Sequence, residues 1–174
     1  TGQHSMIYKR LLLNYVPLAI SAAFLTSCEL YSNDQPDPPL FGASIGGSFK
    51  LTNSANEVIE WKDFEGQYRI VYFGFTYCPD VCPTDVQRLS QGLMEFERDA
   101  PNLGRKITPI FISIDPERDT PEIMGEFISN FHPRLVGLTG STEAIAEAAR
   151  NFAIYYARGQ ETPAGGYLVD HSAV

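Results

Sequence analysis

Two cysteines separated by three residues, Cys78 and Cys82, are the side chains of this sequence best suited to chemistry. They lie in the segment TYCPDVCP, directly after an apolar run at residues 69–75 and directly before a helical pattern. The N-terminus of a helix carries a partial positive charge and unpaired N–H groups, and both lower the pKa of a nearby thiol. Because the thiolate is the form that attacks disulfides and binds soft metals, the pair indicates redox or metal chemistry.

Two less specific interpretations of the cysteine pair are open. Buried core cysteines or a simple disulfide need no fixed spacing and no place at the end of a strand, so they explain the pattern less well. A structural zinc site requires four protein ligands, and too few cysteines and histidines lie near this pair to supply them.

His171 is the histidine best placed to complete the pair. It follows a strand-like run in the segment YLVDHS, about 90 residues after the cysteines, and an α/β sheet can bring separate strand ends together. Two thiolates and one imidazole form a soft ligand set that suits copper in either oxidation state. Of the other histidines, His4 lies in the leading segment, and His132 is interpreted as a residue that interacts with a helix C-terminus.

The elements that must position these residues alternate between strand and helix patterns. Turn-forming residues 53–56 separate two β-prone runs and predict an N-terminal β-hairpin. The predicted strands span residues 49–52, 58–61, 69–75, 107–114, 135–138, 154–157 and 167–169, and the predicted helices span residues 84–100, 119–131 and 141–152. This alternation predicts an α/β fold, a central mixed sheet flanked by helices, with functional groups beyond the carboxyl ends of the strands.

Two helix starts carry further signals. Pro83 suits the first position of the helix after the cysteines, and the predicted apolar face of that helix comprises Val86, Leu89, Leu93 and Phe96. The segment DPERDTPE at residues 115–122 is interpreted as turn and helix-cap chemistry, with a cap followed by a proline in the first turn.

Composition and charge limit the classes of partner. The 174 residues fit one domain, and 44% hydrophobic with 20% charged residues is typical of a chain that buries a core. Thirteen Lys and Arg against 21 Asp and Glu give a net charge of −8, and without Lys9 and Arg10 the remaining 11 basic residues leave −10. Such an acidic domain repels phosphate backbones, which argues against a nucleic-acid partner. Three cysteines are too few for a disulfide scaffold.

The first 40 residues are interpreted as a leader. Residues 1–5 indicate a cloning scar, residues 6–27 combine a short positive start with an apolar run, as in a signal peptide or membrane anchor, and proline-rich residues 28–40 form a tether. The sequence LTSC, ending at Cys28, resembles the lipobox of bacterial lipoproteins, whose cysteine is lipidated. An uncleaved anchor, or a buried core helix with a free Cys28, are the alternatives. Lipidation or an anchor would hold the domain on the periplasmic side of a bacterial membrane.

Three segments together closely resemble the Sco/SenC family: YCPDVCP at residues 77–83, IDPERDTP at 114–121 and YLVDHS at 167–172. The resemblance covers roughly residues 41–174 and implies a thioredoxin-like fold. It also implies a membrane-tethered copper-binding protein that helps assemble the CuA centre of cytochrome c oxidase, with the CuA-bearing subunit as partner. Carried over by position, Cys78, Cys82 and His171 would be the copper ligands, and Asp80 and Asp170 would support the metal site or face the partner.

One departure from the family concerns the C-terminal end. Family members continue past the histidine motif with further strands and a helix, so the resemblance implies that this chain is cut short and lacks C-terminal elements. A missing central strand would expose an apolar sheet edge, which is an aggregation hazard.

Two functions fit these residues. A copper chaperone would bind Cu(I) or Cu(II) and pass it on by ligand exchange, without turning over a substrate. A thiol–disulfide reductase acting on the oxidase subunit's cysteines would attack with Cys78 and resolve the mixed disulfide with Cys82, and thiol peroxidase is a weaker third reading. Dedicated thioredoxin-type oxidoreductases use Cys-x-x-Cys, so the wider spacing here favours metal binding.

Overall fold

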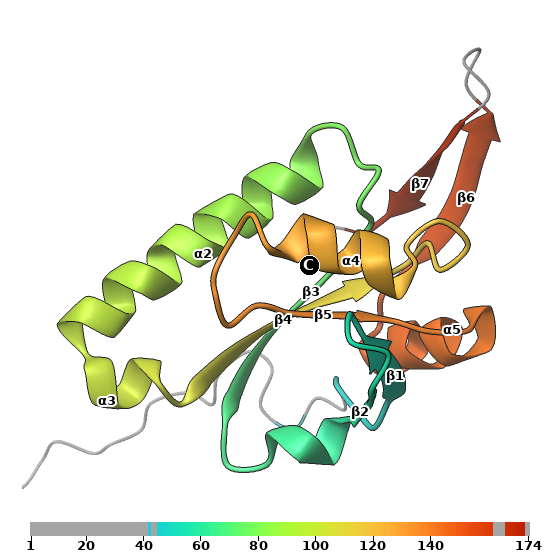
Figure 1. The fold of residues 1–174 in the computed structure, drawn as a ribbon. Coiled ribbons are helices and arrows are strands. Elements are labelled where there is room, and N and C mark those ends of the chain that lie inside the picture. The colour runs from blue at the N-terminus through green and yellow to red at the C-terminus, as the bar shows by residue number, and fades with distance from the viewer. Residues whose placement is uncertain (1–41, 43–44, 162–165, 173–174) are drawn as a thin grey trace, which may run out of the picture. The chain divides into compact units, whose positions relative to one another are not determined.

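A computed structural model of the chain describes Gly42, residues 45–161 and residues 166–172 (Figure 1). The predicted cloning scar, signal or anchor segment and tether, including Cys28, lie outside these residues. No helix within the described ranges is both long enough and apolar enough to cross a bilayer. The elements in chain order are β1 (Lys50–Asn53), β2 (Val58–Glu60), η1 (Trp61–Phe64), β3 (Tyr68–Gly74), α2 (Val81–Asp99), α3 (Pro101–Gly104), β4 (Ile107–Ser113), α4 (Pro121–Ile128), β5 (Val136–Thr139), α5 (Thr142–Asn151), β6 (Tyr156–Glu161) and β7 (Tyr167–His171).

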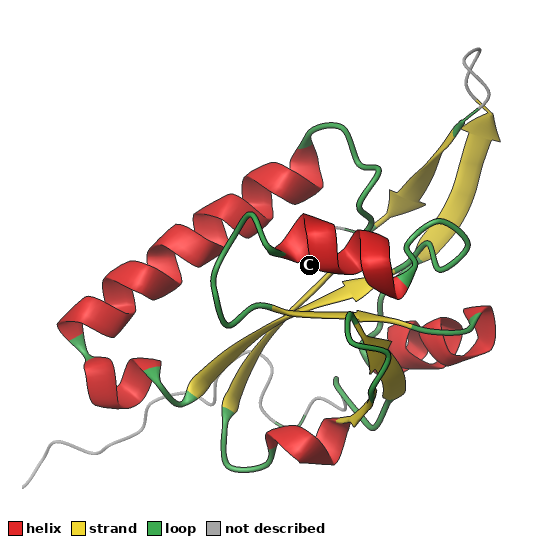
Figure 2. Ribbon diagram, viewed as in Figure 1, coloured by secondary structure: helices red, strands yellow, loops and turns green. Residues whose placement is uncertain are grey.

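Five strands form a mixed sheet in the order β2-β1-β5-β4-β3, with helices packed around it (Figure 2). β3, β4 and β5 are parallel, whereas β1 is antiparallel to both β2 and β5. The predicted N-terminal hairpin, central mixed sheet and flanking helices are therefore confirmed. Because parallel strands end at the same edge of a sheet, the loops that follow β3 and β4 lie beside each other at that edge.

Alternate side chains of β4 divide the core between the two faces of the sheet. Ile110 and Ile112 belong to one buried cluster, which includes Ile145 of α5. Phe111 belongs to a second cluster, which includes Val86 of α2 and Met124 of α4. β4 is thus covered on both faces, as its near-continuous apolar run predicts.

The strand predicted at residues 154–157 does not extend the central sheet. Within the described residues, β6 pairs with β7 alone, in an antiparallel two-stranded sheet that stands apart from the five strands (Figure 1). β6 reads YARGQE, and Arg158, Gln160 and Glu161 are exposed. A strand with so many polar side chains cannot be covered on both faces, which explains why it forms a projecting hairpin.

The first long helix begins earlier than its sequence pattern predicts. α2 starts at Val81, so Cys82 lies in its first turn and Pro83 is the third helical residue rather than the first. The buried residues are Cys82, Val86, Ser90 and Leu93, and the predicted core residue Phe96 is 40% exposed. The small Ser90 occupies a buried position that a search for apolar periodicity passes over.

The helix predicted from residue 119 to residue 131 is shorter than expected. α4 spans Pro121–Ile128, and the side chain of Thr120 caps it by accepting a hydrogen bond from the Ile123 N–H at 3.4 Å. The predicted cap followed by proline is therefore present, with Thr120 as the cap. Asp119 lies outside the helix and is fully buried.

Candidate metal centre

The cysteine pair lies where the carboxyl end of β3 turns into α2. Gly74 ends β3, Cys78 lies in the connecting loop, and Cys82 lies in the first turn of α2. A Cβ atom on Gly74 would be 3.0 Å from the Cys82 sulfur and 3.1 Å from the Phe111 ring. A glycine at this position therefore lets the sulfur pack directly against the end of the strand.

The structure brings His171 to the cysteines across 89 residues of sequence. The distance between His171 Nε2 and Cys82 Sγ is 4.0 Å. The His171 ring also meets the Phe75 ring edge-on, with centroids 6.2 Å apart. Bonds from a first-row metal ion are about 2.3 Å to sulfur and about 2.0 Å to nitrogen, so one ion could bridge the two side chains.

The orientation of the imidazole follows from its second nitrogen. His171 Nδ1 lies 3.0 Å from the carbonyl oxygen of Ser172. Because a carbonyl oxygen can only accept, Nδ1 carries the proton and donates it. In the neutral imidazole, Nε2 then carries the lone pair and lies on the side of Cys82, as metal binding by a histidine requires.

The two thiols differ in burial and acidity. Burial raises the pKa of Cys78, but hydrogen bonds from Cys82, Asp80 and Val81 outweigh burial, and its pKa falls below the usual range. One of these bonds is donated by the Cys82 backbone N–H to Cys78 Sγ, at 3.4 Å. Cys82 is fully buried, and this burial raises its pKa to about 12. The helix N-terminus thus favours the Cys78 thiolate, as expected, but the same expectation for Cys82 is wrong because desolvation dominates.

Cys78 lies next to Cys82 but does not form a three-residue metal site with Cys82 and His171. Both cysteines are free thiols, Cys78 half-buried and Cys82 buried. Among residues 45–161 and 166–172, no three His, Cys, Asp or Glu side chains are arranged to hold a metal ion together. The structure therefore juxtaposes Cys82 with His171, and it places Cys78 next to Cys82 through the backbone hydrogen bond.

The two aspartates singled out in the sequence lie at the surface near these residues. Asp80 is the N-cap residue of α2, is exposed, and makes no side-chain capping hydrogen bond. Asp170 precedes His171 in β7, is also exposed, and pairs with Ala157 of β6. Neither residue is buried beside the sulfurs, and the roles predicted for both stay predictions.

His132 is a structural residue, although not the helix-end residue that its sequence context predicts. It is 2% exposed, and its Nε2 lies 3.3 Å from Glu97 Oε2 of α2. Its Nδ1 accepts a hydrogen bond from the Arg134 backbone N–H at 3.1 Å, and Arg134 also pairs with Glu97. These bonds fasten α2 to the segment before β5, and His132 contributes nothing to the cysteine site.

Sequence reasoning missed the second role of the DPERDTPE segment. The buried Asp119 carboxylate accepts hydrogen bonds from the Thr76 hydroxyl and the Ser113 hydroxyl, each at 2.6 Å, and from the Thr76 backbone N–H at 3.1 Å. Thr76 lies two residues before Cys78, so Asp119 fixes the loop that carries the first cysteine. The sequence signal for this role was that the segment is one of the three that resemble the Sco/SenC family. The local pattern of the segment indicates only turns and a helix cap.

Asp119 gives the protein a testable dependence of stability on pH. Burial raises the pKa of its carboxyl above the ordinary value of 3.8, and the hydrogen bonds from Ser113 and Thr76 offset part of this. The folded state then binds the proton more tightly than the unfolded state, so the free energy of unfolding falls as pH rises from 3.8 through the raised pKa. Asp119→Asn is expected to remove this fall, as measured by urea unfolding of both proteins across the same pH series. A constant difference between the two proteins at every pH would contradict the expectation.

A sequence model of the family described as SCO1/SenC matches residues 37–174. The chain belongs to the SCO1/SenC family. It is 41% identical over 145 residues to the mouse protein named "Protein SCO2 homolog, mitochondrial", covering 83% of this chain and 56% of that protein. The chain spans about half the length of the curated relatives it matches.

Solved SCO1/SenC structures have the same fold. The Arabidopsis thaliana ScoI structure with copper bound is 40% identical, with a TM-score of 0.69 over 74% of this chain and 78% of that chain. The Bradyrhizobium japonicum ScoI structure, also with copper bound, is 39% identical, with a TM-score of 0.67 over 74% of this chain and 79% of that chain. The predicted thioredoxin-like fold is therefore confirmed.

Proposed function

We propose that this protein is a copper carrier that binds one Cu(I) or Cu(II) ion through Cys78, Cys82 and His171. We also propose that the protein delivers this ion to the subunit that carries the CuA centre of cytochrome c oxidase. The observation that supports it most strongly is the distance of 4.0 Å between His171 Nε2 and the Cys82 sulfur. Thiolate sulfur and imidazole nitrogen together form a donor set that binds copper in preference to harder ions.

The difference between the two cysteines suits a carrier that must release its ion. Cys82 is buried and His171 is half-buried, so these two side chains would retain the ion at the base of the site. Cys78 lies in the loop, half-buried, with a lowered pKa, and would complete the ligand set by turning toward the ion. A three-ligand site at the surface leaves a position for an incoming ligand of the recipient.

His171→Ala tests the ligand set and is expected to weaken Cu(II) binding more than Cu(I) binding. Imidazole matters more to the harder Cu(II), whereas two thiolates can hold Cu(I) without it. We expect a loss of at least about 100-fold for Cu(II) and of about 10-fold or less for Cu(I), on the usual preference of each ion for nitrogen and sulfur. Competition titrations of each ion against a chelator of known affinity measure the two losses. Equal losses would refute this ranking of the two ions, and unchanged Cu(II) binding would mean that His171 is not a ligand.

A thiol–disulfide reductase is the second candidate, because the sulfur atoms are asymmetric in the way such an enzyme requires. The Cys78 thiolate would attack a partner's disulfide and release one partner thiolate, and Cys82 would then attack Cys78 and release the second. The lowered pKa and partial exposure of Cys78 favour the first step. The same His171→Ala protein separates the two functions. If the reduced, copper-free variant reduces a disulfide peptide at the parent rate, but the variant no longer binds copper, His171 serves the metal alone.

The membrane location belongs to the proposal as well. We place the domain on the periplasmic side of a bacterial membrane, held by lipidated Cys28 or by an anchor at residues 6–27. The leader pattern supports this placement. The curated mouse relative is mitochondrial by name, and the Bradyrhizobium structure comes from a bacterium, so the family has members in mitochondria and in bacteria.

A further inference from the structure

The loop after β4, residues 115–119, contacts the segment that carries the cysteines. Asp119 holds the backbone and hydroxyl of Thr76, two residues before the first cysteine of that segment. The neighbouring Arg118 guanidinium lies over the ring of Tyr77, 4.9 Å from its centroid, and 5.8 Å from the ring centroid of Phe75. The cysteine loop is therefore attached to residues 115–119 by hydrogen bonds and by cation–π contacts.

The same loop holds the β6–β7 hairpin, which carries His171. The hydroxyl of Tyr167, the first residue of β7, donates to Asp115 Oδ1 at 2.6 Å. The Arg118 guanidinium lies 3.7 Å from the Tyr167 ring centroid, and its Nε donates to Asp115 Oδ2 at 2.5 Å. Burial and the Asp115 carboxylate raise the pKa of Tyr167 to about 12, so its hydroxyl stays protonated and continues to donate.

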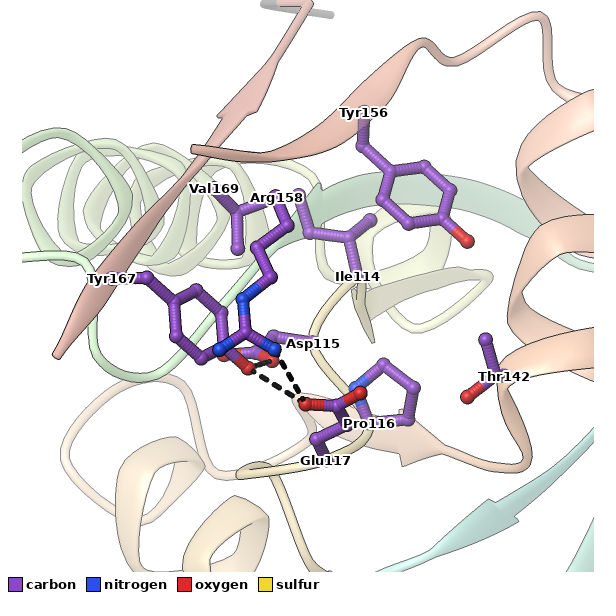
Figure 3. A pocket seen from close by; sticks show the side chains of 9 residues that line it. All are labelled: Ile114, Asp115, Pro116, Glu117, Thr142, Tyr156, Arg158, Tyr167 and Val169. Carbon is purple, nitrogen blue, oxygen red and sulfur yellow. Dashed lines mark hydrogen bonds and ion pairs between the residues drawn. The ribbon is translucent and has the colours of Figure 1, made fainter. Parts of the chain in front are cut away.

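Figure 3 shows the hairpin side of these contacts, where Arg158 and Tyr167 face Asp115 and Glu117 across a small pocket. The Arg158 guanidinium lies 3.8 Å from the Tyr167 ring centroid, and Glu117 Oε2 accepts from both Arg158 and Tyr167 at 3.3 Å. Tyr167 of β7 and Arg158 of β6 thus join the hairpin to the loop after β4.

The hairpin needs such contacts because it receives no ladder hydrogen bonds from the five-stranded sheet in the described part of the chain. Val169 is buried in the core and anchors β7 by apolar packing. Apolar packing is non-directional, whereas a stacked guanidinium and a short hydrogen bond fix an orientation. The orientation of β7 determines where the imidazole at its end is presented.

We propose that Arg118 is a positioning residue for the metal centre, because its guanidinium contacts Tyr77 on the cysteine loop and Tyr167 on the hairpin and so sets the separation between the sulfurs and His171. The inference rests on the proposed function. Arginine is suited to this task because its planar group can stack on aromatic rings while pairing with the Asp115 carboxylate. Arg118 is itself anchored, since its side chain is only 21% exposed.

The test compares the full chain with Arg118→Gln and Arg118→Lys. Gln removes the charge and the stacking, so Cu(II) affinity is expected to fall about 10-fold, while Cu(I) affinity changes less than about threefold, as for other groups that orient a ligand. The nitrogen hyperfine coupling in the electron paramagnetic resonance spectrum of the Cu(II) form should weaken. Lys keeps the charge next to Asp115 and should recover part of the loss. Arg98→Gln is the control, because Arg98 is exposed on α2 and pairs with Glu95 of the same helix, at 4.0 Å.

A second measurement needs no copper and keeps the inference separate from the proposed function. The edge-to-face contact of His171 with Phe75 should give ring-to-ring nuclear Overhauser effects in the copper-free protein. Arg118→Gln is expected to lose them and Arg98→Gln to keep them, with both variants folded by circular dichroism. If Arg118→Gln does not fold, the same measurement is made on Arg118→Lys, in which the cross-peaks between the His171 and Phe75 rings are expected to weaken rather than disappear.

The outcomes are distinct. Intact ring-to-ring effects in a folded Arg118 variant overturn the positioning role, and so do equal losses for Cu(I) and Cu(II) together with a matching loss of thermal stability. Unchanged Cu(II) binding in His171→Ala overturns the proposed ligand set instead. In that case the copper-free measurement still decides whether Arg118 orients the hairpin.

Discussion

Changing Cys82 to serine is expected to lower bound Cu(I) from one ion per chain to less than about a tenth, because a hydroxyl is a hard, weak ligand for a soft ion. Cys82 is fully buried, and its sulfur lies 4.0 Å from His171 Nε2, which makes it the sulfur at the base of the site. Reduced protein is loaded with one equivalent of Cu(I), separated from free metal by gel filtration, and analysed for copper and protein.

The chain supplies a matched control for this change. Cys28→Ser also removes one of the three cysteines but leaves both members of the pair, so it should retain one copper per chain. Circular dichroism of Cys82→Ser establishes that the variant folds with its buried hydroxyl. One tightly bound copper in folded Cys82→Ser would mean that this thiol is not a ligand.

Asp119→Ala is expected to lower the free energy of unfolding by about 3–5 kcal/mol, the largest stability effect among the changes considered, because it leaves buried donors unpaired. The variant leaves the Thr76 N–H and hydroxyl and the Ser113 hydroxyl without their acceptor. Removing a buried acceptor costs about 1–3 kcal/mol for each donor left unpaired. Urea unfolding of parent and variant at neutral pH measures the difference.

Thr120→Ala is the matched control, since Thr120 is the adjacent residue and caps α4. Loss of a helix cap costs about 1 kcal/mol, so the two neighbours should differ by at least about 2 kcal/mol. Equal losses would mean that Asp119 acts only as part of the helix start, as the sequence pattern alone suggests. Copper binding by the two variants should follow the same order, because Asp119 holds the loop that carries Cys78.

Local patterns were sufficient to predict the type and order of the elements near the site. The run at residues 107–114 predicted β4, observed at Ile107–Ser113, because a strand buried on both faces requires a continuous apolar sequence. Thr120 followed by Pro121 indicated a helix start because a cap and a first-turn proline act within a few residues. The cysteine pair was placed correctly at a strand-to-helix turn for the same reason.

Other features depended on contacts that local patterns do not encode. The acidity of the thiols was predicted correctly for Cys78 and wrongly for Cys82, because the N-terminus of a helix is visible in sequence but the depth of burial is not. β6 has strand propensity, yet its polar residues exclude it from the central sheet, and only the observed pairing shows that it projects as a hairpin with β7.

By itself, the sequence determined which donor atoms are available and that two sulfurs belong to one turn, since ligand chemistry and short-range spacing are properties of residues. The tertiary structure decided that the imidazole of His171 faces Cys82, and that Asp115, Arg118 and Asp119 tie the two segments together. These contacts join residues 40 to 90 positions apart, at distances set by how the loops pack at the end of the sheet. Helix and strand periodicity extends over a few residues only, so it carries no information about such separations.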